Sequence, residues 1–205
     1  MSRYEALALA IAFALGSIPF GPILVRLRGG PRLRDVGSGN IGATNVVRAS
    51  GMATGVTTLL LDVAKGWAGV ETGLLVAARA SETWAPFAAL LVLSPVLGHS
   101  YSPFVLFRGG KGVAAAIGVF IAVDPALAGV ALAAFVAVAG PSRYVSAGSL
   151  ALAFAAAAAC WWRPGPGPLA VGVVLVALLV LLRHRENIVR LSKGEENKFG
   201  ARSGP

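Results

Sequence analysis

A glycine-rich polar segment covers residues 36–48, with the sequence VGSGNIGATNVVR. Glycine accepts positive φ and carries no side chain, so the backbone N–H groups of such a segment can converge on a small anion. If a helix begins near Thr44, the N–H groups and partial positive charge of its first turn add to that site. Arg48 can then bind a phosphate through two hydrogen bonds. The segment is a candidate phosphate-binding loop, although a glycine-rich segment alone is also typical of a flexible turn.

A second polar segment, GHSYSPFVLFRGGKG, covers residues 98–112 and directly precedes an apolar run. Its glycines and Lys111 would aim helix N-terminal amides and an ammonium at one point, which again suits a phosphate. The alternative for Lys111 is an interfacial lysine whose long side chain only extends to the water surface.

A third polar segment, HRENIVRLSKGEEN, covers residues 184–197. As a helix, it places His184, Asn187, Ile188 and Leu191 on one face, because these residues are three or four positions apart. The alternative is a basic tail that lies on anionic lipid. A histidine and an asparagine on a shared face favour a binding role.

The chain has few groups for conventional nucleophilic or metal chemistry. It contains one cysteine and two histidines, which excludes a disulfide framework and leaves little for a metal site, so we expect none. There is no HExxH helix, and no Lys-Ser or Lys-Thr follows the first segment as in a Walker A loop. Neither histidine begins a His-x4-Asp motif, because Phe104 and Val189 stand five positions after them. An enzyme with this inventory needs a substrate that is already activated.

Asp62 and Lys65 stand three residues apart inside an apolar run, on one side of the predicted helix. Ionisable groups at membrane depth are costly, and pairing offsets part of that cost. The pair is either structural or part of the site, and the sequence alone leaves both interpretations open.

Seven apolar runs must position these segments, at 4–25, 54–78, 85–98, 112–123, 125–139, 145–162 and 168–183. A membrane-spanning helix needs about 17–25 residues, so the runs 85–98 and 112–123 are short. We expect an all-α polytopic membrane bundle of about seven transmembrane helices; if the short runs are re-entrant, five remain. Asp124-Pro125 is a plausible turn between two runs, since the residue before proline disfavours helix.

The basic residues indicate the orientation of these spans. With the N-terminus outside and the C-terminus cytoplasmic, the segments 26–53, 99–111, 140–144 and 184–205, together with Arg183 at the membrane edge, hold 14 of the 18 lysines and arginines, as the positive-inside rule predicts. Residues 12–14 (Ala-Phe-Ala) resemble a signal-peptide cleavage site, but the apolar run continues past them and the basic cluster follows the run, so we expect the first span to be retained.

Composition agrees with a membrane protein. Of the 205 residues, 56% are hydrophobic and 13% are charged, with a net charge of +9. Soluble domains carry about 25% charged residues, so an ordinary soluble or disordered chain is excluded. A basic, apolar chain of this kind is typical of a membrane protein with charge in its loops, and we expect no nucleic-acid partner. We expect residues 1–205 to form a single domain.

Four motifs together resemble the bacterial acyl-phosphate:glycerol-3-phosphate acyltransferase family: GSGNIGATNVVR at 37–48, GHSYSPFVLFRGGKGVA at 98–114, SRYVSAGS at 142–149 and HRENIVRLSKGEE at 184–196. Their order and spacing extend the resemblance over essentially the whole chain. One departure is Ala115, where the family often has threonine. The resemblance implies transfer of a fatty acyl group from acyl phosphate to the sn-1 hydroxyl of glycerol 3-phosphate, giving 1-acylglycerol 3-phosphate and phosphate without a cofactor.

The resemblance also implies roles for individual residues. The catalytic residues would be Ser38, Lys111 and Asn187. The substrate-binding residues would be Gly39, Asn40, Gly42, Thr44, Asn45, Arg48, His184, Ser146 and Arg190. The enzyme would be a multi-pass protein of the bacterial inner membrane, surrounded by membrane lipids, with its active site on the cytoplasmic side. In the family, a substrate phosphate is thought to take the hydroxyl proton.

The competing function is a transporter of a phosphorylated or anionic solute, whose half-helix N-termini also face anions. The polar segments all lie on one predicted face and the chain shows no internal duplication. Both features favour the enzyme.

Overall fold

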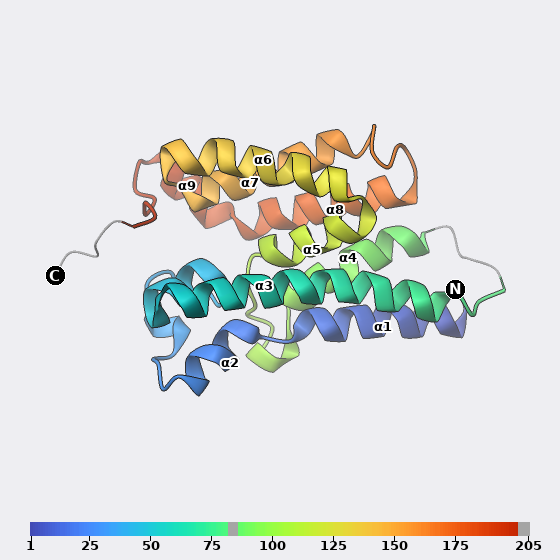
Figure 1. Ribbon diagram of the computed structural model, residues 1–205, viewed down its shortest axis with the longest axis horizontal. Coiled ribbons are helices and arrows are strands. Elements are labelled where there is room, and N and C mark those ends of the chain that lie inside the picture. The colour runs from blue at the N-terminus through green and yellow to red at the C-terminus, as the bar shows by residue number, and fades with distance from the viewer. Residues whose placement is uncertain (82–85, 201–205) are drawn as a thin grey trace.

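The computed structural model describes residues 1–81 and 86–200, and that part of the chain is helical without strands. Its elements are α1 (Arg3–Ser17), α2 (Phe20–Leu27), η1 (Leu33–Asp35), α3 (Ala43–Ala77), α4 (Phe87–Ser100), η2 (Pro103–Val105), α5 (Val113–Val123), α6 (Pro125–Ser142), α7 (Val145–Ala159), α8 (Pro168–Arg183) and α9 (Arg185–Ser192). The N-terminus and the C-terminal segment lie at opposite ends of the bundle (Figure 1).

Each predicted apolar run forms a helix, but several boundaries differ. The run 4–25 divides into α1 and α2 at Pro19, which lacks the amide hydrogen that a continuing helix needs. The run predicted to begin at residue 54 starts earlier, because α3 begins at Ala43. The run 145–162 is shorter than predicted, because α7 ends at Ala159 and turns follow. The first residue of the run 85–98, and Arg202 of the basic tail, lie outside the described residues.

Within the described residues, four segments are long and apolar enough to cross a membrane: Arg3–Leu27, Ala43–Ala77, Phe87–Val105 and Pro125–Ser142. The pair α8 and α9 forms a fifth if its 58° bend belongs to one span. The run at 112–123 is short as predicted, since α5 has 11 residues, whereas α4 and η2 together reach 19 residues. The number of spans therefore remains a prediction.

The turn predicted at Asp124-Pro125 is confirmed. Asp124 is the N-cap of α6 and accepts hydrogen bonds from the backbone amides of Ala126 and Leu127, at 2.8 and 3.4 Å. Proline at the first helical position suits this cap, because that amide has no partner inside the helix. The Asp124 carboxylate also accepts a hydrogen bond of 3.0 Å from Arg163, which joins the α5–α6 turn to the loop after α7.

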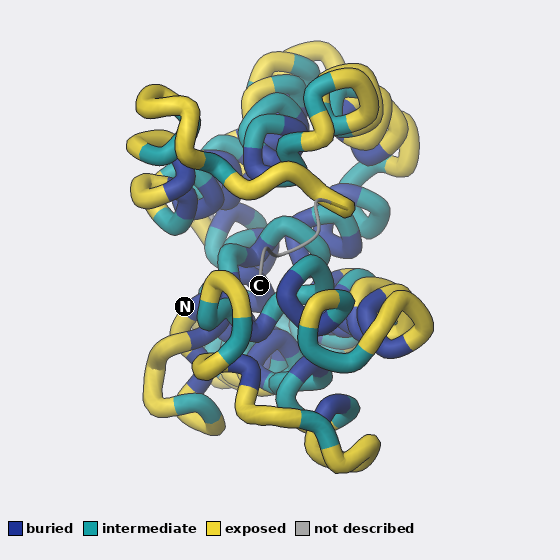
Figure 2. Tube along the Cα trace, turned by 90° about the vertical axis from the view of Figure 1, so that its left-hand side faces the viewer, coloured by how far each residue is buried: buried dark blue, intermediate teal, exposed yellow. Residues whose placement is uncertain are grey.

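The helices pack through small residues on one side and expose large apolar side chains on the other. A Cβ on Gly66 of α3 would collide with the carbonyl of Ala115, and a Cβ on Gly118 of α5 would collide with the carbonyl of Val63. Such close approach is common between membrane helices. Outer positions are exposed along the bundle (Figure 2), including Leu75 at 73% and Trp162 at 79%.

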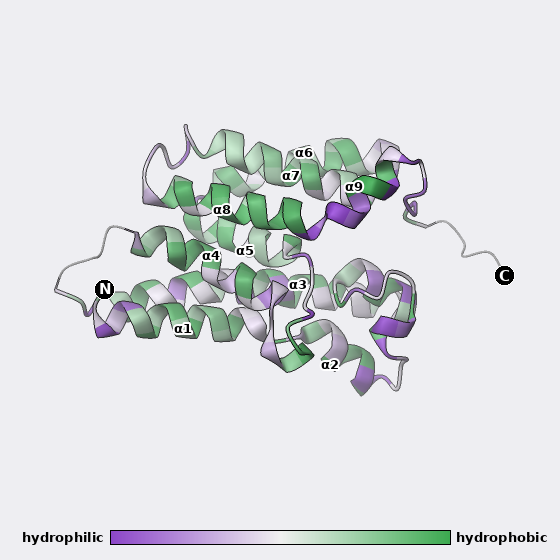
Figure 3. Ribbon diagram, turned by 180° about the vertical axis from the view of Figure 1, so that it is seen from behind, coloured by the Kyte–Doolittle hydropathy of each residue, from purple (hydrophilic) through white to green (hydrophobic). Residues whose placement is uncertain are grey.

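Hydrophilic residues gather at the end of the bundle that carries the C-terminal segment. In Figure 3, α8 is hydrophobic along its length, whereas α9 carries both hydrophilic and hydrophobic residues and the loops beside it are largely hydrophilic. The loop between α2 and α3 lies at this same end (Figure 1). The first and third polar segments therefore lie at one end of the molecule.

Candidate active site

Asn45 holds the first polar segment in its folded shape. Its Oδ1 accepts a hydrogen bond of 3.1 Å from the backbone amide of Ser38, and its Nδ2 donates to the carbonyls of Leu33 and Asn40 at 2.9 and 2.8 Å. The side chain is buried, with 1% exposed. The amide that we predicted to contact substrate is thus engaged with the backbone of its own loop.

The other predicted residues of this segment surround the start of α3. That helix begins beside Thr44, as predicted, and its N-cap, Gly42, makes no side-chain hydrogen bond to the first turn, so the turn is open to an anion. Asn40 accepts a hydrogen bond of 3.1 Å from the Gly42 amide. Ser38 and Arg48 are exposed at the surface of the loop and are available to a ligand.

Positive backbone φ angles shape this loop, with Gly37 at 54° and Gly39 at 66°. Only glycine adopts that conformation without strain. A Cβ on Gly37 would also lie 2.6 Å from Asn45 Oδ1 and 3.1 Å from Arg48 Cδ. The glycine therefore lets Arg48 lie directly against the turn.

The second polar segment folds back onto the last turn of α4. The amides of Gly109 and Gly110 donate to the carbonyls of Ser100 and His99, both at 3.1 Å. From α8, the Arg183 guanidinium donates to the carbonyls of Gly109 and Gly110 at 3.0 and 3.2 Å. A Cβ on Gly110 would collide with His99 Nε2. These contacts fix the backbone that leads into Lys111.

Five side chains form one hydrogen-bonded group, which we call the Lys111 cluster. Lys111 Nζ donates to Oδ1 of Asn187 on α9. Oε1 of Glu196 accepts from Asn187 Nδ2 at 2.8 Å and from Ser146 Oγ at 3.0 Å, while its Oε2 accepts from Arg190 Nε at 2.8 Å. The structure thus brings together four predicted site residues from three parts of the chain: Lys111, Ser146, Asn187 and Arg190.

Glu196 is the member of the cluster that the sequence reasoning missed. The chain reverses at Gly194, whose φ is 72°, and the Glu195 amide donates to the Arg190 carbonyl at 2.8 Å. Burial acts to raise the pKa of Glu196, but hydrogen bonds from Arg190, Asn187 and Ser146 outweigh it, so the pKa is lowered. The available sequence signal was a pair of acidic residues after a glycine in an otherwise basic tail.

The Lys111 ammonium lies in a partly desolvated place. Burial lowers its pKa to about 8, against the opposing effects of Glu196 and Glu186, and Arg190 and Arg183 lower it further. An ammonium loses its proton when the pH rises above its pKa. Lys111 is therefore mostly cationic at pH 7 and becomes neutral in mildly alkaline solution. A bound phosphate would favour the charged form.

His184 lies at the bend between α8 and α9 and is 2% exposed. Its Nδ1 is 2.8 Å from the carbonyl oxygen of Val180. Since a carbonyl oxygen only accepts hydrogen bonds, Nδ1 carries the hydrogen and Nε2 of the neutral ring is an acceptor. His184 stands three residues before Asn187, and its role in holding substrate remains a prediction.

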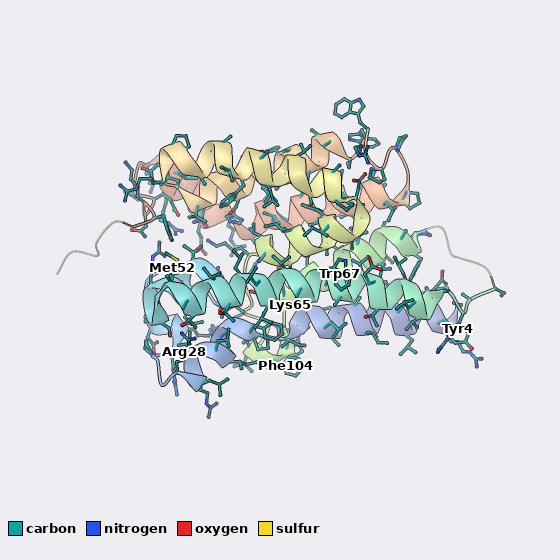
Figure 4. All side chains as sticks on the ribbon, in the orientation of Figure 1. Tyr4, Arg28, Met52, Lys65, Trp67 and Phe104 are labelled. Atoms are coloured by element: carbon teal, nitrogen blue, oxygen red, sulfur yellow. The ribbon has the colours of Figure 1, made fainter. Side chains whose placement is uncertain are left out.

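The Asp62–Lys65 pair supports the second polar segment from inside the bundle. Lys65 Nζ is 2.8 Å from Asp62 Oδ1 and donates to the carbonyl of Ile18 at 2.6 Å. His99 Nδ1 lies 3.7 Å from Asp62 Oδ1, and the ring of His99 packs on Gly110. Figure 4 places Lys65 on the side of α3 that faces α1 and α2. These contacts favour the structural interpretation of the pair.

The three polar segments are joined in series. Arg34 Nη2, next to the first segment, donates to the carbonyls of Val105 and Arg108 in the second, at 3.0 and 3.4 Å. The second segment contacts α8 and α9 through Arg183 and Lys111. The resulting site offers helix N-terminal amides and cations to anions. It suits the positioning of two anionic substrates.

Comparison with known proteins gives consistent results over the whole chain. A family model described as "Glycerol-3-phosphate acyltransferase" matches residues 6–194. A glycerol-3-phosphate acyltransferase from Geobacter sulfurreducens is 44% identical over 201 residues, which cover 96% of this chain and 98% of the relative. Glycerol-3-phosphate acyltransferase 1 from Deinococcus radiodurans is 40% identical over 200 residues, covering 98% of each chain.

Two solved structures have the same fold. The crystal structure of PlsY (YgiH), an integral membrane glycerol 3-phosphate acyltransferase, in its glycerol 3-phosphate form is similar with a TM-score of 0.86 and 37% identity, over 96% of each chain. The lysophosphatidic acid form is similar with a TM-score of 0.83 and 35% identity, over 96% of this chain and 95% of that one.

Proposed function

The chain belongs to the glycerol-3-phosphate acyltransferase family, and we propose that it takes its acyl group from an acyl phosphate. It is a multi-pass membrane enzyme that transfers an acyl group to glycerol 3-phosphate and forms lysophosphatidic acid. This activity replaces the transporter that the sequence left as the competing function.

The proposed reaction needs no covalent enzyme intermediate. The sn-1 hydroxyl oxygen of glycerol 3-phosphate attacks the carbonyl carbon of the acyl phosphate, and an ester bond forms. The bond between that carbon and the phosphate oxygen breaks, so inorganic phosphate leaves. The hydroxyl proton passes to a phosphate oxygen of the substrate. A mixed anhydride has a good leaving group, so the protein contributes mainly positioning and charge.

The observation that carries the proposal is the Lys111 cluster. A cation with a pKa of about 8 lies there beside amide, hydroxyl and guanidinium groups that already bind one anion, the carboxylate of Glu196, and next to a glycine-rich helix start. We assign Lys111, Asn187 and Ser38 to the reacting acyl phosphate. The glycines and Asn40, Thr44 and Arg48 of the first loop would hold a phosphate, as would the side chains of His184, Ser146 and Arg190. Asn45 would contribute by shaping the loop.

We place the active site on the cytoplasmic side of the bacterial inner membrane. The site lies at the end of the bundle where the basic loops gather (Figures 1 and 3), and basic loops are retained in the cytoplasm. Glycerol 3-phosphate and inorganic phosphate are too polar to enter the hydrocarbon, whereas the acyl chain of the donor can remain in the bilayer. We propose one domain over residues 1–205, with no cofactor.

The test is acyl transfer by the purified protein in detergent, with palmitoyl phosphate and glycerol 3-phosphate as substrates. We expect release of phosphate and formation of lysophosphatidic acid only when both substrates are present. Palmitoyl-CoA should not replace palmitoyl phosphate. Equal or faster transfer from palmitoyl-CoA would overturn the proposed donor and leave the acyltransferase activity in place.

A matched pair of lysine variants tests the assigned site. Lys111→Ala should lower kcat/KM by at least about 100-fold, the cost of removing one group that stabilises developing charge. Lys193→Ala removes an exposed lysine at the same end of the molecule and should leave activity near the original value. Full activity in Lys111→Ala protein would remove Lys111 from the site.

A further inference from the structure

A pocket with a mixed chemical character lies between α2, η1 and η2. Its cavity volume is about 580 Å³. Its lining includes three arginines, Arg26, Arg32 and Arg34, and apolar residues from α2, η1, η2 and the loop before α3, among them Val25, Leu33, Ile41, Phe104 and Leu106. The described residues that line it include no acidic side chain. The pocket therefore combines cationic and apolar side chains.

The apolar side chains at this pocket are far more exposed than is usual on the surface of a soluble protein. Phe104 is 68% exposed and Leu106 is 81% exposed, and the neighbouring Leu27 at the end of α2 is 77% exposed. Figure 4 shows Phe104 at the outer edge of the bundle, on the same side as Arg28. Apolar side chains beside arginines are typical of a membrane interface, where the chains enter the hydrocarbon and the guanidinium groups stay at the headgroups.

We propose that this pocket binds a resident anionic phospholipid of the bilayer, with its phosphate on the arginines and an acyl chain along Phe104 and Leu106. Charge complementarity favours an anion, because Arg26, Arg32 and Arg34 line the pocket and no acidic residue among the described ones does. The apolar wall requires an acyl chain on the same molecule. A free phosphate or a nucleic acid satisfies only the first requirement.

The pocket is separate from the Lys111 cluster. Figures 1 and 3 show α2 and α9 at opposite edges of the bundle with α3 between them. Lys111 is hydrogen-bonded to Asn187 on α9, whereas the pocket is lined by α2 and the two 3-10 helices. The pocket borders the first polar loop through Ile41, but the acyl phosphate must reach Lys111 beside α9, which a lipid held in the pocket need not do.

Arg34 connects the pocket to the site. Its Nη2 donates to the carbonyls of Val105 and Arg108, so it ties the loop before α3 to the loop before α5. Leu33, which also lines the pocket, accepts the hydrogen bond from Asn45 that holds the first loop. A lipid that fills the pocket would stabilise the two loops in their present relation, and would raise the thermal stability of the protein.

The experiment compares lipid retention by native mass spectrometry after purification in a neutral detergent, with added phosphatidylglycerol or phosphatidylcholine. The original protein should retain phosphatidylglycerol and gain thermal stability from it, and phosphatidylcholine should do neither. Inorganic phosphate at the same concentration should give no thermal shift. The Arg26→Gln/Arg32→Gln double variant should bind phosphatidylglycerol tenfold or more weakly, since each arginine near an anionic lipid contributes about 1 kcal/mol.

The matched control is the Arg185→Gln/Lys193→Gln double variant, which removes two exposed cations from α9 and the residue after it. This control should retain the lipid as the original protein does. Phe104→Ser tests the apolar wall separately and should weaken retention although all charges remain. If both double variants lost phosphatidylglycerol equally, general surface charge and not the pocket would account for lipid binding. A raised KM for palmitoyl phosphate in the Arg26→Gln/Arg32→Gln protein would make the pocket part of the donor site and overturn the proposal.

Discussion

Lys111 has a titration that should be visible in the pH dependence of the enzyme. Burial lowers its pKa to about 8 in the free protein. The group is cationic below that value, so a reaction that needs the ammonium is fully supported below pH 8 and weakens as the pH rises through it. We expect kcat/KM to fall with a midpoint near pH 8. A bound phosphate favours the ammonium, so kcat should fall at a higher pH than kcat/KM.

The Lys111→Arg variant is the control for this assignment. Arginine stays charged throughout the accessible range, so the alkaline decline should disappear even if the maximal rate is lower. An unchanged alkaline decline in Lys111→Arg protein would assign the titration to another group.

Glu196 should matter for stability as well as for activity. Its carboxylate accepts hydrogen bonds from Ser146, Asn187 and Arg190. Glu196→Ala leaves these donors without their partner, and we expect a loss of about 2 kcal/mol in the free energy of unfolding. Thermal denaturation in detergent should show a lower midpoint, and glycerol 3-phosphate should bind more weakly.

Glu195→Ala is the matched control, because Glu195 is exposed beside Glu196. It should leave the thermal midpoint within error of the original protein.

The stabilisation from Glu196 depends on its lowered pKa, so it is present above about pH 4.5 and is lost as the pH falls through the lower pKa of the folded protein. A midpoint for Glu196→Ala equal to that of Glu195→Ala would exclude this role.

Residue types and spacing pointed to Lys111 and Asn187, and the resemblance to the family added Ser146 and Arg190, but neither showed how the members of the cluster meet. Lys111 and Asn187 were recognisable because an isolated lysine among glycines and an asparagine on a helical face have few structural uses. Glu196 was missed because its partners depend on the chain reversal at Gly194, which is a tertiary feature. Asn45 was predicted to contact the substrate. Its residue type does not reveal that its side-chain oxygen and nitrogen are both hydrogen-bonded to nearby backbone groups.

At the scale of elements, hydropathy identified every apolar helix but not all of the ends. The first two turns of α3 contain too many polar residues to be recognised as an apolar run. The backbone also leaves the helical conformation at Ser50 and Gly51, where φ is −146° and 81°. The chain after Ala159 is apolar yet leaves the helix, because a glycine- and proline-rich stretch follows it. Such ends are set by packing and by turn residues, not by the apolar content of a run.

The crossing of α3 and α5 should be sensitive to a single methyl group. A Cβ on Gly118 would collide with the carbonyl of Val63, and backbone at that position has no rotamer with which to move away. Gly118→Ala should cost about 1–3 kcal/mol of stability. Because α5 begins next to Lys111, its displacement should also lower kcat. Thermal denaturation and initial rates measure the two effects.

Gly129→Ala in α6 is the control for that crossing. Nothing lies within 4 Å of the position that its Cβ would occupy. Alanine is favoured over glycine in a helix, so this variant should be as stable as the original protein or slightly more stable. Equal destabilisation by Gly118→Ala and Gly129→Ala would show that the stability of the protein does not depend on the close approach of α3 and α5.

At the scale of the whole molecule, the chain combines a net charge of +9 with 56% hydrophobic residues because its charged and apolar residues lie in different regions. Apolar side chains form the core and much of the outer surface of the bundle, while the polar segments gather at one end (Figures 2 and 3). Part of the charge contacts groups of the site, as Arg183, Arg190 and Lys111 do. Other basic residues, such as Arg26 and Arg32, face the pocket that we assign to lipid. We therefore expect the same end to set the orientation in the membrane and to bind the substrates.

The orientation and the number of spans can be tested by labelling single cysteines in intact cells. Cys160 is the only cysteine and is buried, so Cys160→Ala provides the background. If seven helices cross the membrane with the C-terminus in the cytoplasm, Ala126→Cys and Trp162→Cys should react with a membrane-impermeant maleimide added outside spheroplasts. Arg108→Cys and Asn197→Cys should react only after permeabilisation. All four positions are exposed in the structure.

Arg108 distinguishes the two span counts, because it lies between the two short runs, the second of which forms the 11-residue helix α5. An α-helix of that length covers about 16 Å, roughly half of the hydrocarbon thickness, so α5 can cross only if the bilayer thins or if polar ends extend it. Labelling of Arg108→Cys only after permeabilisation, with Ala126→Cys and Trp162→Cys reactive from outside, supports seven crossings. Labelling of Arg108→Cys from outside, with the other two positions unchanged, would make both short runs re-entrant and contradict the seven-span arrangement.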